Sequence, residues 1–233
     1  MLKNVSWEML YLRKLNLIIK RGFDIFCSAF GIVVLLPVFA LIAIAIKGTS
    51  NGPVFFVQER LGKNGEVFKI LKFRTMVLNA ESIGDGLFVY AGSDSRITKI
   101  GGVLRKTSMD ELPQLLNVLK GDMSLVGPRP PVTYFPYNGY EAYPEWAVKR
   151  FQMKPGMTGL VQIRTRATIP WDDRILIDNE YIDAFSVLLD IKILWQTFLC
   201  VLFRKNIYPE TKEQINNSDS LRAKKDAGIP VKK

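Results

Sequence analysis

The sequence predicts a helix-rich α+β fold with a membrane-associated helix near its N-terminal end. Residues 26–46 are an apolar run without a charged side chain, and a helix of that length would about cross a hydrocarbon core of roughly 30 Å. Two β-rich runs flank Asn64-Gly65, which is a strong hairpin signal. Leucines 112, 115, 116 and 119 recur at helical spacing. We therefore expect a membrane segment at 1–50, a cytosolic domain with a β-hairpin at 51–205, and a polar tail at 206–233.

The composition limits the partners and the kinds of catalytic site that this protein can have. The chain has 233 residues, a net charge of +10, no histidine and two cysteines. A net positive charge is typical of proteins that bind polyanions. The apolar run favours anionic lipid or a phosphorylated substrate over nucleic acid as that partner. Without histidine there can be no Ser-His or Cys-His nucleophile pair and no histidine-ligated metal. Both cysteines lie in apolar runs, so we expect no disulfide and a catalytic part in the cytosol.

The flanks of the apolar run favour a re-entrant helix. Positive charge draws loops toward the cytoplasm, and basic residues lie on both sides: Lys14, Lys20, Arg21, Lys47, Arg60 and Lys63. Pro37 would bend the helix, so both ends could stay on the cytoplasmic side. A single span with a tolerated proline is the alternative. We predict that Lys20, Arg21, Asp24 and Pro37 form the anchor, with Asp24 and Arg21 as an ion pair at the membrane edge.

Two further segments have a membrane-surface pattern. Residues 7–21 mix aromatic, aliphatic and basic side chains, which suits the headgroup layer. Residues 185–205 are strongly apolar but interrupted by Asp190, Lys192 and Gln196. The second segment is therefore predicted to be an amphipathic interfacial helix or a helix packed in the core.

The cytosolic part contains a candidate dyad. Asp110 and Glu111 follow Arg105 and Lys106, and Ser108 stands in capping-box spacing with Glu111. This predicts a helix whose first turn carries both carboxylates. One interpretation is structural, because acidic residues complement a helix N-terminus. The other is catalytic, because an ionised aspartate beside a bound phosphate can attack phosphorus or bind Mg²⁺.

Other cations could hold phosphate. Lys72 and Arg74 are two residues apart in the second predicted strand and would share a face. Arg129 lies between two prolines, which present its guanidinium from a stiff backbone suited to bidentate phosphate binding. Solvated surface and a rigid loop are the respective alternatives. No P-loop and no GxGxxG motif occurs.

Several long segments together resemble the bacterial sugar transferases, and more specifically the monotopic polyprenyl-phosphate phosphoglycosyl transferases. These segments are "FKILKFRTM" (68–76), "LRKTSMDELPQLLNVLKGDMSLVGPRP" (104–130), "PGMTGLVQI" (155–163) and "LLDIKIL" (188–194), with the helix that contains Pro37. The resemblance implies transfer of a phosphosugar from a UDP-sugar to undecaprenyl phosphate at the cytoplasmic face of the bacterial inner membrane, with release of UMP. It also implies Mg²⁺ as cofactor, a ping-pong mechanism and a possible homodimer. No nucleic acid is expected.

The same resemblance implies roles for individual residues. Asp110 would be the nucleophile and a Mg²⁺ ligand, Glu111 its dyad partner, and Arg105 a group that steadies phosphate charge. The implied substrate-binding residues are Lys72, Arg74, Arg129, Lys154, Gln162 and Arg166. The chain departs from the usual family pattern at Leu36, at Lys154 and at Arg164-Thr165, in regions that bear on the helix bend and on sugar identity. The alternatives are a noncatalytic module that binds anionic lipid and a glycosyltransferase that releases UDP.

Overall fold

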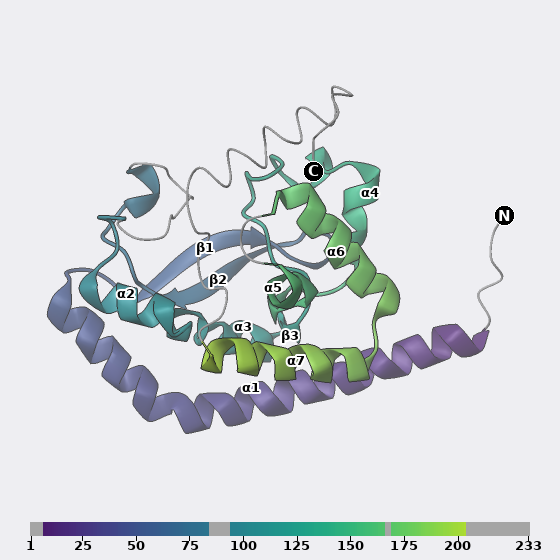
Figure 1. The fold of residues 1–233 in the computed structure, drawn as a ribbon, viewed down its shortest axis with the longest axis horizontal. Helices are drawn as coiled ribbons and strands as arrows, with labels where there is room; N and C mark the ends of the chain where they lie inside the picture. Colours follow the sequence, from purple (N-terminus) through teal and green to yellow (C-terminus); the bar gives the residue numbers. More distant parts are fainter. Residues whose placement is uncertain (1–6, 84–93, 166–168, 204–233) are drawn as a thin grey trace.

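The structure is a computed structural model that describes residues 7–83, 94–165 and 169–203. Figure 1 shows a helix-rich α+β domain that lies along one long N-terminal helix. This confirms the helix-rich α+β part of the prediction. The predicted tail at 206–233 lies outside the described residues.

The long helix, α1, runs without interruption over Trp7–Thr49 and contains Pro37. It is the one helix of the described chain that is long and apolar enough to cross a membrane. Figure 1 shows that α1 changes direction along its length, and a bend lets a helix tolerate the missing N–H and the ring clash of a proline. The predicted break at Pro37 and the re-entrant hairpin are not confirmed, because the helix continues through the proline.

The predicted hairpin is confirmed. Strands β1 (Phe55–Leu61) and β2 (Val67–Phe73) are antiparallel, with Phe55 opposite Phe73 and Leu61 opposite Val67. The turn between them contains the short helix η1 (Lys63–Gly65). Asn64 has φ 55° and Gly65 has φ 80°, which is the positive-φ pair that an Asn-Gly step adopts in a tight hairpin.

The leucine-rich segment begins its helix later than predicted. Helix α2 (Lys99–Lys106) is followed by a 3₁₀ turn, η3 (Met109–Glu111), and then by α3 (Gln114–Lys120). Ser108 has φ 55° and its side chain caps nothing, so the predicted capping box is wrong. The backbone at Ser108 is left-handed, whereas an N-cap residue is typically extended. The dyad lies in the turn that joins the two helices. Gly121 ends α3 with φ 104°, as predicted.

Helix α3 is fastened along the edge of β2 by Asn117. Its side-chain oxygen accepts from the Leu71 N–H at 3.0 Å, and its amide donates to the Lys69 carbonyl at 2.8 Å. Phe68, Ile70, Val118 and Met123 form a buried cluster between the two elements. These contacts therefore fix the position of the hairpin relative to α3, the helix that follows the dyad.

The second half of the chain builds the remainder of the domain. A short parallel pair, β3 (Ser124–Val126) and β4 (Gly156–Thr158), precedes α5 (Leu160–Arg164), α6 (Trp171–Ala184) and α7 (Val187–Leu202). The remaining short helical segments are η2 (Ala80–Ser82), η4 (Tyr140–Ala142), α4 (Glu145–Val148) and η5 (Lys149–Gln152). Gly127 and Gly156 pack so closely that a Cβ on Gly156 would lie 2.1 Å from the Gly127 nitrogen. Larger side chains would therefore push β4 away from the segment that follows β3.

Helix α1 joins the domain through a polar stripe on one face. Lys20, Asp24 and Ser28 are spaced by four residues and are all buried. Asp24 accepts from the Ser124 hydroxyl at 2.7 Å and from the Leu125 N–H at 3.0 Å. The predicted ion pair between Asp24 and Arg21 is therefore wrong, because the domain supplies the partners of Asp24. Arg21 instead donates to the carbonyls of Val118 and Leu119 at the end of α3.

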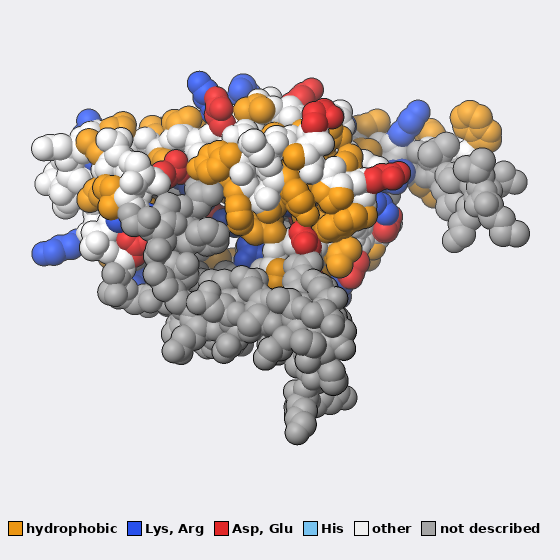
Figure 2. All heavy atoms as spheres, turned by 90° about the horizontal axis from the view of Figure 1, so that it is seen from above, with side chains coloured by type: hydrophobic (Ala, Val, Ile, Leu, Met, Phe, Trp, Pro, Cys, Tyr) orange, Lys and Arg blue, Asp and Glu red, His pale blue; other side chains and the backbone are white. Residues whose placement is uncertain are grey.

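The rest of α1 presents an exposed apolar surface. Phe26, Val33, Leu36 and Ile44 are each more than 60% exposed. Helix α7 lies beside α1 in Figure 1 and exposes Leu188, Ile191, Trp195, Phe198 and Leu202 on one face while Asp190 and Ile193 are buried. The opposite side of the domain, seen from above in Figure 2, mixes hydrophobic, acidic and basic side chains. The predicted core packing is confirmed for the buried face of α7. A position at the membrane surface stays a prediction for its exposed face.

Candidate active site

The centre of the candidate site is the contact between Lys72 and Glu111. The Lys72 Nζ lies 2.6 Å from Oε1 of Glu111, and both side chains are partly buried. Lys72 comes from β2 and Glu111 from η3, and α3 fixes these elements against each other through Asn117. Of the two strand cations that were predicted to bind substrate, Lys72 thus lies at the dyad.

Opposing electrostatic effects act on the two carboxylates. Burial and the neighbouring Glu111 raise the pKa of Asp110 to about 6, against the pull of Lys72 and Arg105. Burial would also raise the pKa of Glu111, but Lys72, Arg129 and Arg60 outweigh it and lower that pKa to about 2. Glu111 therefore stays ionised at neutral pH, while Asp110 is a carboxylate that exchanges its proton close to neutrality.

Arg105 supports the dyad from α2. Its Nε donates to the Thr75 hydroxyl at 2.8 Å, which fixes the guanidinium beside the end of β2. From there its charge opposes the rise in the pKa of Asp110. The structure thus places Arg105 near the proposed nucleophile, where it could steady an anionic substrate.

Arg129 reaches the same site from the loop after β3. It lines a hollow together with Lys72, Glu111 and Gln114, and its charge contributes to the low pKa of Glu111. The fully buried Arg150 donates to the Arg129 carbonyl at 2.6 Å and lies 2.8 Å from Asp178. Sequence reasoning missed Arg150, whose hydrogen bond to the Arg129 carbonyl fixes the backbone of this proline-rich loop.

Arg60 is a second residue that sequence reasoning did not assign to the site. It lies in β1, lines the same hollow as Arg129 and donates from NH1 to the Pro130 carbonyl at 3.0 Å. Once the hairpin is predicted, alternation of side chains along β1 limits Arg60 to one of two faces. Which face meets the dyad depends on the packing of α3, which the sequence does not display.

Two predicted substrate-binding residues, Arg74 and Lys154, lie away from the dyad, a third, Gln162, remains a prediction, and a fourth is outside the described chain. Arg74 is buried and donates to the carbonyl and hydroxyl of Ser50 at 3.0 and 2.7 Å, because the chain leaves the strand after Phe73. Lys154 lies near Gly121 and Arg21, at the opposite end of α3 from the dyad. Gln162 is in α5, and both its amide atoms are buried without a hydrogen-bond partner in the described chain. Arg166 lies outside the described residues.

The carboxylates suit a magnesium ion that is shared with a substrate. In the described chain no three Asp, Glu, His or Cys side chains gather into a metal cluster. Magnesium commonly binds proteins through one or two carboxylates and takes its other ligands from water and substrate phosphates. Asp110, with Glu111 beside it, fits that pattern, and Mg²⁺ at Asp110 remains a prediction.

Comparison with known proteins places the chain in a family. The sequence model of the bacterial sugar transferases matches residues 15–204, which include α1, the dyad and α7. The chain belongs to the bacterial sugar transferase family.

Several named bacterial sugar transferases are similar to this chain. The galactosyl transferase CpsE of Streptococcus agalactiae serotype III (strain NEM316) is 40% identical over 208 residues, which cover 85% of this chain and 45% of the relative. The exopolysaccharide production protein ExoY of Sinorhizobium fredii (strain NBRC 101917 / NGR234) is 35% identical over 210 residues, covering 84% and 91%. The UDP-glucose:undecaprenyl-phosphate glucose-1-phosphate transferase of Caulobacter vibrioides (strain ATCC 19089 / CIP 103742 / CB 15) is 41% identical over 194 residues, covering 81% and 72%. The chain thus spans less than half of CpsE and most of ExoY.

Proposed function

We propose that this protein transfers a sugar 1-phosphate from a UDP-sugar to undecaprenyl phosphate, releases UMP, and so begins the assembly of a membrane-bound glycan. The observation that carries the proposal is the pairing of Asp110, a partly buried carboxylate with a raised pKa, with a dyad partner held by Lys72. Family membership and the printed activity of the Caulobacter relative support the same reaction class. The names of the relatives differ in the sugar, so the proposal commits to none.

The first proposed step is an attack by an ionised oxygen of Asp110 on the β-phosphorus of the donor. A new bond forms between that oxygen and phosphorus, the bond between phosphorus and the bridging oxygen breaks, and UMP leaves with the bond electrons. In the second step an oxygen of the lipid phosphate attacks the same phosphorus and displaces the Asp110 carboxylate. This order predicts ping-pong kinetics.

The cations of the site offset the main electrostatic obstacle. Both the nucleophile and the diphosphate are anionic, so their approach is unfavourable unless positive charge lies nearby. In this proposal Arg105, from α2, and Arg129, from the loop after β3, supply that charge. Mg²⁺ bound at Asp110 with the diphosphate would add charge for the same purpose. Glu111, ionised and paired with Lys72, keeps that lysine beside the reacting groups.

The exposed apolar faces support a position at the membrane. Helix α1 would enter the bilayer, and the exposed side of α7, with Trp195 and Phe198, would lie in the headgroup layer beside it. The basic residues at both ends of the apolar run favour a re-entrant path with the catalytic domain on the cytoplasmic face. This arrangement would bring the dyad to a lipid phosphate and leave it open to a soluble nucleotide sugar.

The experiment that tests the proposal is an assay of nucleotide release. Detergent-purified protein is incubated with undecaprenyl phosphate, Mg²⁺ and a panel of UDP-sugars, and UMP is separated from UDP. We expect UMP, formed with one preferred sugar, to require lipid, metal and Asp110, and Asp110→Asn to abolish it. Release of UDP would instead indicate a glycosyltransferase. Absence of any turnover, with vesicle binding unchanged in Asp110→Asn, would indicate a noncatalytic lipid-binding module.

A further inference from the structure

The hollow beside the dyad carries more positive charge than its own residues neutralise. Its lining includes three cations, Arg60, Lys72 and Arg129, and one carboxylate, Glu111. Lys72 already pairs with Glu111 at 2.6 Å. Two guanidinium groups from different parts of the chain therefore line one recess, and the one carboxylate in its lining is already paired with Lys72.

The guanidinium of Arg60 is buried, and part of its hydrogen-bonding capacity is unused. NH1 donates to the Pro130 carbonyl, while Nε is buried and has no hydrogen-bond partner among the described residues. Among the described residues, the carboxylates of Glu81 and Glu111 lie near enough to raise the pKa of Arg60, but Glu81 accepts its hydrogen bond from Gln58 and Glu111 from Lys72. Burial and the proximity of Arg129 lower the pKa of Arg60 to about 10. Burying a guanidinium next to a like charge is unfavourable unless an anion compensates.

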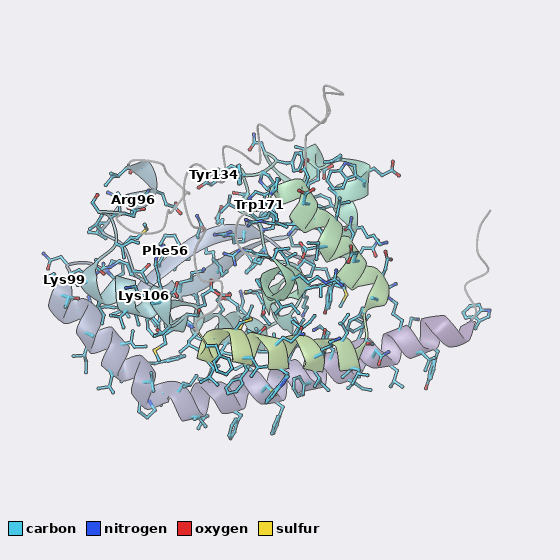
Figure 3. The ribbon with its side chains drawn as sticks, in the orientation of Figure 1. Phe56, Arg96, Lys99, Lys106, Tyr134 and Trp171 are labelled. Atoms are coloured by element: carbon cyan, nitrogen blue, oxygen red, sulfur yellow. The ribbon has the colours of Figure 1, made fainter. Side chains whose placement is uncertain are left out.

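The hairpin directs Arg60 toward the reacting groups. The register sets Phe56 opposite Lys72 and Arg60 opposite Phe68, so Arg60 and Lys72 lie on the same face of β1 and β2. Figure 3 shows Phe56 on this hairpin, between the segment of Tyr134 and helix α2 with Lys106. The Glu111 carboxylate lies close enough to Arg60 for the arginine to help lower its pKa.

We propose that Arg60 and Arg129 together form a phosphate-binding subsite, in which Arg60 is a substrate-binding residue. A phosphate oxyanion placed between the two guanidinium groups would accept hydrogen bonds from both and remove their mutual repulsion. The ligand is either the diphosphate of the nucleotide-sugar donor or the monophosphate of the lipid acceptor. This assignment rests on the proposed function for the identity of the ligands, while the subsite itself follows from the charges of the recess.

Binding of unreactive ligands tests the subsite separately from turnover. The full chain in lipid nanodiscs is titrated calorimetrically with UDP and, separately, with a short-chain polyprenyl phosphate, for wild type, Arg60→Gln and Arg60→Lys. Because Arg60→Gln removes charge-assisted hydrogen bonds, it should weaken the binding of at least one ligand by roughly tenfold or more. Arg60→Lys, which keeps the charge but loses the fork, should weaken the same ligand by a smaller factor.

The control removes a cation from the exposed face of the same hairpin. Lys69 is exposed and opposite Glu59, and Lys69→Gln should leave both dissociation constants within about twofold of wild type. The ligand that Arg60→Gln weakens identifies the phosphate. Unchanged binding of both ligands would overturn the subsite, even if UMP release were normal. If Arg60→Gln does not fold, unchanged binding in Arg60→Lys overturns it. Loss of binding in an enzyme that releases no UMP would retain the subsite and reject only the reaction.

Discussion

The Nζ of Lys20, in the long N-terminal helix, lies 2.5 Å from Oδ2 of Asp190, in α7. Lys20 also donates to the Val126 carbonyl at 2.9 Å, and the Tyr181 hydroxyl donates to the other oxygen of Asp190 at 2.7 Å. Val126 ends β3, three residues before Arg129. A membrane-type helix is thereby connected through buried polar contacts to the strand that leads into the candidate site.

Removal of this buried pair should destabilise the domain. Lys20→Met leaves the Asp190 carboxylate without its cation, and breaking a buried ion pair from one side costs about 3–5 kcal/mol. We expect a clearly lower melting temperature in detergent, measured by circular dichroism. Lys14→Met, which changes an exposed lysine of the same helix, is the control and should melt like wild type. Equal melting temperatures for the two variants would contradict the role of the pair.

The first half-reaction should depend on the ionisation of Asp110. The raised pKa of about 6 means that the carboxyl is protonated, and inactive as a nucleophile, below that pH. The rate of UMP release without lipid acceptor should therefore rise as the pH increases through about 6 and level off above it. Glu111, with a pKa of about 2, should add no step in that range. Rapid-quench measurements between about pH 5 and 8 check this, and a rate that is flat through that range would contradict it.

Lys72 should control the position of that step. Its charge lowers the pKa of both dyad carboxylates, so Lys72→Met should move the step to higher pH and reduce the rate at neutral pH. Removal of a preorganised charged group commonly lowers the rate by about 10²–10³-fold. Lys72→Arg, which keeps the charge, should keep the step nearer its wild-type position. A profile for Lys72→Met that coincides with wild type would show that the ion pair is without electrostatic effect on Asp110.

Arg74 should act on stability and not on substrate binding. It connects the end of β2 to the segment after α1 through Ser50, and a Cβ on Gly52 would lie 2.1 Å from its NH1. Arg74→Met should lower the melting temperature, because a buried guanidinium with its hydrogen bonds is lost. The KM for the UDP-sugar should remain close to wild type. A raised KM with an unchanged melting temperature would restore the original assignment of Arg74 to the substrate.

Local signals in the sequence were enough to predict the hairpin and the apolar helix. The composition of the candidate site depends on contacts between residues far apart in the sequence, which those signals do not reveal. The Asn64-Gly65 turn depends on the backbone preference of two residues, and the apolar run depends on composition, so both could be recognised directly. The partners of Asp24 lie about a hundred positions away in β3, and the chain itself does not display that pairing. Ser108 is a second case that the sequence did not reveal. Its spacing to Glu111 fits a capping box, but its backbone is left-handed and its side chain makes no cap hydrogen bond.

Lys72 and Arg74 illustrate how two basic residues of one predicted strand come to have different partners. The two residues were predicted to share a face, but the strand ends at Phe73, so Arg74 lies just outside it. Lys72 consequently meets Glu111, and Arg74 meets Ser50. The opposite happened to Arg60, which was not predicted to be in the site. The sequence of β1 indicated only a hairpin, but the register of β1 with β2 places Arg60 on the same face as Lys72, and it lines the hollow beside the dyad.

The central claim, that Asp110 becomes covalently bound to the phosphosugar, is tested most directly by mass spectrometry. Wild-type protein and Asp110→Asn are mixed with the preferred UDP-sugar and Mg²⁺ without lipid acceptor, quenched in acid and digested. We predict a phosphosugar adduct on the peptide that contains Asp110 in wild type alone, and its disappearance when undecaprenyl phosphate is added before the quench. UMP release at the full rate with no adduct on that peptide, or an adduct on another residue, would contradict the account.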